Sequence, residues 1–475
     1  MDRARVRRYL QYTSPAGNRG VESWRDEIRA TLSLAVPLAL AQLAHIGIQT
    51  TDVLMMGWLG PTALAAGTLG ANIYTPLWLF GLGIVMAVAP MAAQALGARR
   101  FRSVRRIVRQ GFWVATAVSL PSALVIWQGE AILLAFGQAP ANAASAGDYL
   151  RVMVWGFAPS LWLVVLRCFV AAHTRAKSVL MVMILGVVVN FVGNYVLMFG
   201  HFGFPALGLV GAGISTSIAN GIMFAALLGY VLWDRKFRRY AILYRLFWKD
   251  WPRFREILRI GLPIGVTILA ESGLFAAAGL LMGLIGTEQL AAHAIALQCA
   301  VVAFMIPLGI SQATTIRVGR AAGAGSRSGV GKAGWCAMAL GLVFMLAAAL
   351  CFLLLPEQLV DLFLDLNKPA NIEVLHYGVI FLSIAALFQV FDGAQVVSMG
   401  CLRGLKDTRV PMYFALLCAW GIGFGACAVL AFPLGLGGVG IWLGLSLGLA
   451  TLSGLMTWRF HRQSQCAPIG AMAAA

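Results

Sequence analysis

The chain alternates between long apolar stretches and short polar loops. Each apolar stretch is about twenty residues or longer, which is the length that a helix needs to cross the hydrocarbon core of a bilayer. The pattern therefore predicts an all-α membrane protein with twelve transmembrane helices. The predicted spans lie near residues 32–57, 64–95, 110–136, 149–172, 178–200, 207–233, 258–285, 290–316, 333–356, 374–400, 411–432 and 437–459.

Short motifs recur at a constant spacing, which indicates an internal repeat. Seven residues return 226 positions later: Pro37, Met56, Gly57, Gly60, Leu64, Ala65 and Ala66 recur as Pro263, Met282, Gly283, Gly286, Leu290, Ala291 and Ala292. Six helices per half give both halves the same orientation. We therefore expect two six-helix repeats related by a pseudo-twofold axis along the membrane normal, with the substrate at their interface. The predicted segments are an N-terminal segment (1–31), an N-terminal half (32–233), a linker (234–257), a C-terminal half (258–459) and a tail (460–475).

Positive charge is unevenly distributed between the two sets of loops. Of the 36 Lys and Arg residues, only Arg151 and Lys368 are expected on the loops of one face. Cytoplasmic loops carry the excess of Lys and Arg, so this bias and the even number of spans place both termini in the cytoplasm. The basic, aromatic segment 238–254 is expected to be a solvated loop held to lipid headgroups, with an interfacial amphipathic portion.

The composition agrees with a membrane protein. The 475 residues are 60% hydrophobic and 11% charged, whereas charged residues make up about a quarter of soluble domains. A net charge of +18 suggests nucleic-acid binding in a soluble protein, but here the basic loops account for it, and no nucleic-acid partner is expected. The eight cysteines show no metal-ligand spacing, and no GxxxxGK[ST] loop for nucleotide binding is found. We expect no cleaved signal peptide.

Three acidic residues lie inside predicted spans: Asp52, Glu271 and Asp392. A charged carboxylate at mid-bilayer costs about 2.5–3.5 kcal/mol on insertion scales, so such residues usually face a cavity on an ion or substrate pathway. The alternative for each is a hydrogen-bonded carboxylate that only fixes helix packing. No Lys or Arg is expected at matching depth. A proton or a small hard cation would then neutralise these acids, which indicates a coupling-ion site.

Polar residues near Asp52 fit either of two roles. Asn190 and Asn194 lie one turn apart on the fifth span, and they could orient the carboxylate by hydrogen bonds or simply join two helices. His45 is expected to line a cavity or to pack, because no second histidine follows three or four residues later to share a metal.

Three segments resemble those of a known transporter family: TTDVLMMGWLG in span 1, LPIGVTILAESGLFAAAGLLMG in span 7 and FQVFDGAQVVSMGCLRGLKDTRVP in span 10. The resemblance, from about residue 25 to 460, is to the multidrug and toxic compound extrusion (MATE) transporters, in their NorM-type bacterial branch. It implies an antiporter of the bacterial inner membrane that expels small organic, often cationic compounds in exchange for Na+ or H+. We expect a monomer surrounded by membrane lipids, with no cofactor besides the coupling ion.

The resemblance also implies roles for individual residues. Glu271 and Asp392 would belong to the cation site of the second half, where Na+ could bind, and Asp52 would take part in coupling. Some relatives carry a tyrosine one turn before the span 10 aspartate, where this chain has a phenylalanine. Its ring could still contact a cation, but the hydroxyl ligand is lost. The substrate cavity is expected to be lined by Asp52, Asn190, Asn194, Phe388 and His45.

Other classes of protein fit less well. A major facilitator transporter usually carries an Asp in the loop after its second span, which GARRFRSVRR (97–106) lacks. A lipid-linked precursor flippase of the same wider superfamily would need basic residues in its cavity, whereas the mid-membrane charges here are acidic. An intramembrane enzyme would need a nucleophile with a base, or paired histidine ligands. We find neither and expect no enzyme.

Overall fold

The computed structural model describes residues 23–244, 248, 250–364 and 371–466, and the regular structure of these residues is helical. Twelve helical spans are long and apolar enough to cross a membrane, which confirms the predicted number. Lys368 and parts of the predicted N-terminal segment, linker and tail lie outside the described residues. The first half contains α2 (Trp24–Leu59), α3 (Pro61–Met86) with α4 (Val88–Gly97), α5 (Phe101–Trp127), α7 (Pro140–Ala172), α8 (Ala176–Phe199) and α9 (Gly208–Trp233).

The second half has the same sequence of spans. The eleventh span of the chain contains a π-helical segment, η2, which approaches the following helix closely at Gly423 and Gly448. Three short helices lie in connections: α6 (Gly129–Ala135), α10 (Arg235–Arg238) and α14 (Pro356–Asp361). The spans are α11 (Trp251–Ile285), α12 (Thr287–Gly323), α13 (Arg327–Leu354), α15 (Ile372–Gly404), α16 (Arg409–Leu416) with η2 (Leu417–Phe424) and α17 (Gly425–Ala431), and α18 (Gly437–Cys466).

Helices of the two halves begin at matching positions. α2, α3 and α5 start at residues 24, 61 and 101, and α11, α12 and α13 start at residues 251, 287 and 327. The repeat offset of 226 residues read from the motifs is therefore reproduced to within one residue over three consecutive spans. The predicted architecture of two six-helix repeats is confirmed.

The third span departs from its predicted limits of 110–136. Its helix runs over Phe101–Trp127, and α6 follows as a separate helix. The first turns of α5 are amphipathic, since Val104 and Ile107 are buried while Arg106 is exposed. A search for continuous apolar runs misses such turns, because their charged residues interrupt the run.

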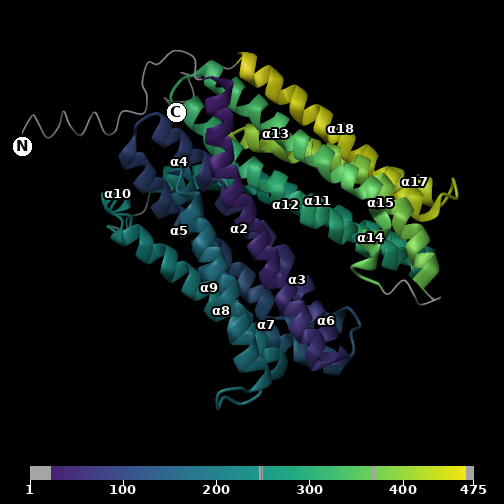
Figure 1. Cartoon of the computed structure of the whole chain (residues 1–475). Coiled ribbons are helices and arrows are strands. Elements are labelled where there is room, and N and C mark those ends of the chain that lie inside the picture. The colour runs from purple at the N-terminus through teal and green to yellow at the C-terminus, as the bar shows by residue number, and fades with distance from the viewer. Residues whose placement is uncertain (1–22, 245–247, 249, 365–370, 467–475) are drawn as a thin grey trace, which may run out of the picture.

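The two halves meet at one end and diverge toward the other, which gives the molecule the shape of a V (Figure 1). At the meeting end, a Cβ added to Gly309 on α12 would come within 2.5 Å of the Ala39 Cα on α2. A Cβ on Gly83 of α3 would likewise come within 2.5 Å of the Gly265 Cα on α11. These helices can approach so closely because glycine has no side chain there. The short helices α6 and α14, at the other end, are well separated.

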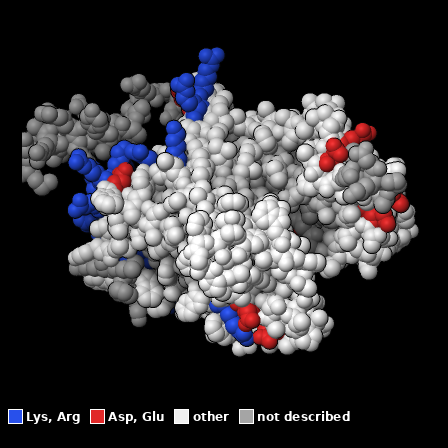
Figure 2. All heavy atoms as spheres, turned by 60° about the horizontal axis from the view of Figure 1, so that its bottom comes forward, with Lys and Arg blue, Asp and Glu red and all other residues white. Residues whose placement is uncertain are grey.

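Charged residues mark the closed end of the V. Figure 2 shows most of the visible Lys and Arg side chains gathered at one end, and a hollow surface between the two halves on the open side. Arg317 on α12 forms a two-pronged ion pair with Glu27 on α2, and its Nε donates to Glu27 Oε1 at 2.9 Å. Gln94 Nε2 donates to the Gly404 carbonyl at 2.9 Å. Polar contacts therefore join the halves at the basic end.

The linker between the halves packs on the protein. Phe237 and Ile242 are each 1% exposed, and the Tyr240 hydroxyl is 2.8 Å from His173 Nε2. At its far end Asp250 pairs with Arg106 at 2.5 Å. The expectation of a solvated loop held to lipid headgroups is therefore corrected only in part: Phe237 and Ile242 pack into the core of the first half, whereas Leu243, Tyr244 and Trp248 stay exposed.

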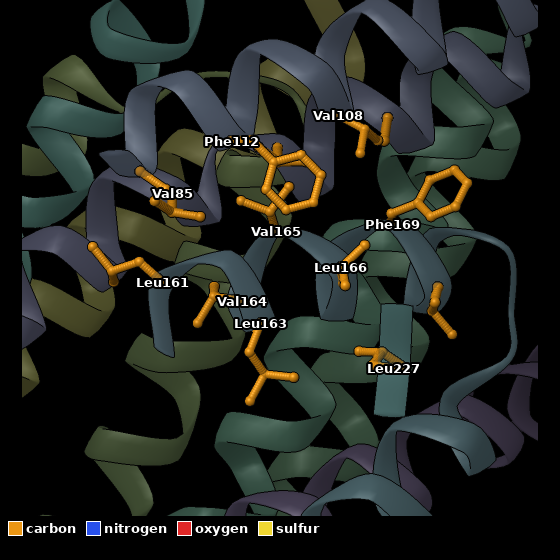
Figure 3. Packing of buried hydrophobic residues seen from close by; sticks show 14 of the residues in the cluster. Val85, Val108, Phe112, Leu161, Leu163, Val164, Val165, Leu166, Phe169 and Leu227 are labelled. Carbon is orange, nitrogen blue, oxygen red and sulfur yellow. The ribbon is translucent and has the colours of Figure 1, made fainter. Parts of the chain in front are cut away.

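The largest hydrophobic cluster lies in the first half, where α7 is covered on several sides (Figure 3). The run LWLVVLRCFV in α7 contributes Leu161, Leu163, Val164, Val165 and Leu166, all buried. A helix whose successive residues are all buried must be surrounded by other helices. The one arginine in this run, Arg167, consequently has its Cα inside the half and not on its lipid-facing side.

Candidate functional site

The first-half site is built around Asp52 on α2. Its Oδ1 accepts hydrogen bonds from Asn194 Nδ2 at 2.7 Å and from Asn190 Nδ2 at 3.0 Å, both on α8. Its Oδ2 accepts from the Thr216 hydroxyl on α9 at 3.2 Å. The structure thus brings together the aspartate and the two asparagines that the sequence singled out.

The three donors around Asp52 are electrically neutral. They lower the cost of holding a carboxylate away from bulk water but leave its negative charge uncompensated. Both asparagines are fully buried, whereas Asp52 keeps partial exposure, and no described Lys or Arg forms an ion pair with it. The carboxylate is therefore partly accessible and carries no ionic partner among the described residues.

Thr216 is a member of this site that sequence reasoning missed. It stands in the polar triplet Ser215-Thr216-Ser217 of the sixth span. Hydroxyl residues in helices often bond to their own backbone, so the triplet alone gave no reason to single it out. Its contact with Asp52 depends on how α9 packs against α8 and α2, which only the fold shows.

The second-half site contains two carboxylates. Glu271 on α11 accepts a hydrogen bond from Gln395 Nε2 on α15 at 2.6 Å. Asp392, one turn before that glutamine, is 9% exposed and close enough to Glu271 for the two carboxylates to interact electrostatically. No hydrogen bond or ion pair to the Asp392 carboxylate is found among the described residues. Gln395 was not predicted, although its spacing of three residues from Asp392 could have indicated it.

Arg403, near the closed end of α15, corrects one expectation. It is 7% exposed, interacts electrostatically with Glu271, and donates to Met399 Sδ at 2.7 Å. A basic group therefore does lie within electrostatic range of the second-half site, because α15 brings its last turn close to α11. Arg403 forms no ion pair with Glu271 or Asp392 among the described residues.

The π-helical segment η2 also borders this site. Its Trp420 ring lies 3.0 Å from the place that a Cβ on Gly273 would occupy, two residues after Glu271. Gly423 of the same segment approaches Gly448 on α18, where an added Cβ would lie 2.8 Å from the Gly423 Cα. The irregular segment therefore packs tightly between α11 and α18.

The two remaining predicted cavity residues, Phe388 and His45, differ in exposure. Phe388 is 1% exposed and lies in the second-half core, with ring centroids 6.0 Å from Phe275 and 5.7 Å from Trp442. The prediction that it lines the cavity is thus corrected: aromatic packing covers its ring. His45 is partly exposed and stacks on Trp78 with centroids 5.1 Å apart.

The donors at these sites are oxygen and amide groups. Among the described residues, no group of three or more His, Cys, Asp or Glu side chains is arranged to hold a metal ion. The pair of Glu271 and Asp392 offers carboxylate oxygens, which suit a proton or a hard cation better than a transition metal.

Comparison with known proteins identifies the family. The model of the MatE family matches residues 37–196 and 263–429, one match in each half. The chain belongs to the MatE (MATE) family, whose members are transporters. The two matches begin at Pro37 and Pro263, the same pair of prolines that revealed the repeat.

Curated MATE relatives match almost the whole chain. A protein of Mesorhizobium japonicum named "Probable multidrug resistance protein NorM" is 49% identical over 95% of this chain and 98% of its own length. A protein of the same name from Rhizobium meliloti is 46% identical over 93% and 94%. These identities confirm the resemblance to the NorM-type branch.

Solved MATE structures share the fold. A eukaryotic MATE transporter matches with a TM-score of 0.82 at 20% identity, covering 94% of this chain and 98% of its own. A multidrug resistance MATE family transporter in an outward-facing conformation matches with a TM-score of 0.83 at 18% identity, covering 94% and 96%. The fold is therefore that of a MATE transporter, and the chain is a multi-pass membrane protein.

Proposed function

We propose that this protein is a cation-coupled antiporter that expels organic, often cationic compounds from the cell in exchange for Na+ or H+. The observation that carries the proposal is the pair of acidic sites, Asp52 in one half and Glu271 with Asp392 in the other. Neither site has an ion-paired base among the described residues. Relatives named as multidrug resistance proteins support efflux of drugs and toxic compounds.

The two sites have different roles in the exchange of substrate for ion. Asp52, held by neutral donors in the first half, attracts a cationic substrate or a proton. Glu271 and Asp392 repel one another until a cation is shared between them, so this pair attracts the coupling ion. Loading the ion changes the charge and the hydration of the interior and thereby weakens the hold on the substrate.

Alternating access requires the closed end of the V to open. The Glu27–Arg317 ion pair and the close helix contacts at Gly83 and Gly309 hold the halves together at the basic end. Both halves would rock about the centre of the bundle, so these contacts separate as the opposite end closes. The V described here then corresponds to the state that releases substrate.

The orientation follows from charge. The closed end carries most of the basic loops, so we place it and both termini in the cytoplasm of a bacterial inner membrane. The open end then faces outward. We infer a monomer whose apolar outer surface contacts lipid.

Voltage can drive the cycle only if net charge moves. One charge that crosses 100 mV is worth about 2.3 kcal/mol. A one-for-one exchange of a monovalent ion for a monovalent cationic drug moves no net charge. Several acidic residues allow more than one ion per cycle, and the membrane potential then contributes.

The experiment that tests the proposal uses purified protein in liposomes that contain a cationic dye such as ethidium. A Na+ gradient and a pH gradient are imposed separately, each directed against the dye flux. At least one gradient should accelerate dye movement over protein-free liposomes. Protein-dependent dye movement at a rate unaffected by either gradient would overturn ion coupling. Absence of any protein-dependent dye movement would overturn efflux.

A further inference from the structure

Five helices form a closed ring in the first half. α2 packs against α3 and α8, α9 packs against α8, and α7 packs against α9 and α3. α2 and α7 therefore face one another across the ring. A side chain from one of them that reaches the other must cross the interior of the half.

α2 presents a polar stripe to this interior. Gln42, His45, Gln49 and Asp52 are spaced three or four residues apart, so they share one face of the helix. Their contacts point inward, since Asp52 is bonded to α8 and α9 and His45 stacks on Trp78 of α3. Gln49 is exposed and the other three are partly exposed, so the stripe borders accessible space.

At the Gln42 end of the stripe, α7 contributes a positive charge. Arg167 Nη2, from α7, donates to Gln42 Oε1 at 2.7 Å across the ring. A guanidinium has five N–H donors, and no other hydrogen bond or ion pair of Arg167 is found among the described residues. The side chain is partly exposed. Intramembrane arginines normally pair with an acid or mark a ligand path, and none of the described acids forms an ion pair with Arg167.

The same ring contains polar atoms without partners. His45 Nε2 and Asn194 Oδ1 are buried and have no hydrogen-bond partner within the described part of the chain. Buried polar atoms in folded proteins are nearly always satisfied. These two atoms lie beside Gln42 and Asp52. They are therefore available to form hydrogen bonds with a polar substrate.

We propose that this chamber recognises its cargo by two opposite charges, a cationic group at Asp52 and a carboxylate at Arg167. The inference rests on the proposed efflux function and specifies its substrates as zwitterionic organic molecules. Gln42 orients the guanidinium, whose planar fork matches a carboxylate with two parallel hydrogen bonds. Gln42 and Asp52 are ten residues apart on one helix, so the two charges of a cargo can be up to about 15 Å apart.

The test compares two dyes that differ only in the carboxylate, rhodamine B and its methyl ester. Both carry the same cation, and only the first is a zwitterion at neutral pH. In proteoliposomes, Arg167→Gln should reduce the apparent affinity for rhodamine B about tenfold, the size expected for a lost charged hydrogen bond, and should change that for the ester less than about twofold. The matched control is Arg175→Gln, an exposed arginine beyond the end of the same helix.

The outcomes separate this inference from the proposed function. If the wild type fails to transport even the ester, the efflux proposal fails. If the ester is transported but Arg167→Gln affects both dyes equally, or affects neither, only the carboxylate site is refuted. Arg167→Lys keeps the charge without the fork and should lose part of the preference for rhodamine B. Should Arg167→Gln not fold, Gln42→Leu must show the same selective loss at smaller size, and an unchanged preference would refute the site.

Discussion

The acidic sites of the two halves are built in opposite ways. In the first half one carboxylate, Asp52, receives three hydrogen bonds from neutral donors on two other helices. In the second half the Gln395 amide donates to only one of the two carboxylates, Glu271, and Asp392 has no hydrogen-bond partner among the described residues. The carboxylate of the first site is thus held by hydrogen bonds on both oxygens, whereas the second site leaves carboxylate oxygens for the proton or cation that we propose binds there.

The internal repeat shows that the acidic residues of the two halves do not occupy equivalent positions. At the offset of 226 residues, Asp52 corresponds to Ala278 and Glu271 corresponds to His45. The helices match in register, but neither acid has an acidic counterpart. The halves therefore do not share their charges, which agrees with the proposal that the first half binds mainly cargo and the second half the coupling ion.

Removing Asp392 should have the largest effect. Asp392→Asn leaves Glu271 without its partner for the ion. We expect ion-driven dye efflux to fall roughly a hundredfold or more, because the coupling cation loses one of its two buried carboxylate partners, a loss of about 3–5 kcal/mol for a buried pair of opposite charges. Efflux is measured in proteoliposomes at matched protein density. The control is Asp361→Asn on exposed α14, and efflux at the wild-type rate in the Asp392 variant would remove it from coupling.

Removing the shortest bond to Asp52 should come next. Asn194→Ala deletes the donor at 2.7 Å and should weaken binding of a cationic dye about thirtyfold, or about 2 kcal/mol, because the carboxylate loses its orientation. The dependence on Na+ or pH should stay unchanged. Asn142→Ala, near the start of α7, serves as the control. A variant that altered ion dependence more than dye binding would contradict the division of work between the halves.

Removing the amide donor of the second half should change ion dependence and leave dye affinity nearly unchanged, the opposite of the effect expected for Asn194→Ala. Gln395→Leu removes the amide on Glu271 and should shift the half-saturating concentration of the coupling ion about tenfold, since Asp392 still holds part of the site. Dye affinity measured without an ion gradient should remain within about twofold. Gln358→Leu on α14 provides the control, and a loss confined to dye affinity would contradict a role of Gln395 in the ion site.

The smallest effect is expected at Thr216. Its hydroxyl gives the longest of the three bonds to Asp52, at 3.2 Å. Thr216→Val keeps the shape and removes the donor, which should raise the apparent KM for a cationic dye about fivefold, or about 1 kcal/mol. The Val variant should unfold at the same temperature as the wild type. An effect as large as that of Asn194→Ala would mean that the hydroxyl, not the amides, holds the carboxylate.

Much of the fold could be predicted because a bilayer imposes strict rules on sequence. The length of apolar runs gave twelve spans, and the repeated prolines gave the two halves. The rules fail where a helix leaves the membrane, as in α5, whose arginine-rich first turns interrupt the apolar run. They also cannot predict the π-helical segment at Leu417–Phe424, which depends on tight packing between α11 and α18.

The residues of the two sites could likewise be predicted only in part from the sequence. Asp52, Asn190 and Asn194 could be connected in advance, because acids and amides are rare in a membrane and their spacing places them on one face. Thr216 could not, since hydroxyl residues are common in helices and only the packing of α9 selects one. Phe388 was placed wrongly for a related reason. Its spacing to Asp392 was correct, but side chains of other helices cover its ring.

The most direct test of the account is whether cargo and coupling ion displace one another. Purified protein in detergent is equilibrated with ²²Na+ or with a pH indicator in weak buffer, and a cationic dye is then added. We predict release of Na+ or protons in proportion to the dye bound, and none from Asp392→Asn. Dye that binds fully to the wild type without releasing either ion would contradict the claim that the two acidic sites are coupled.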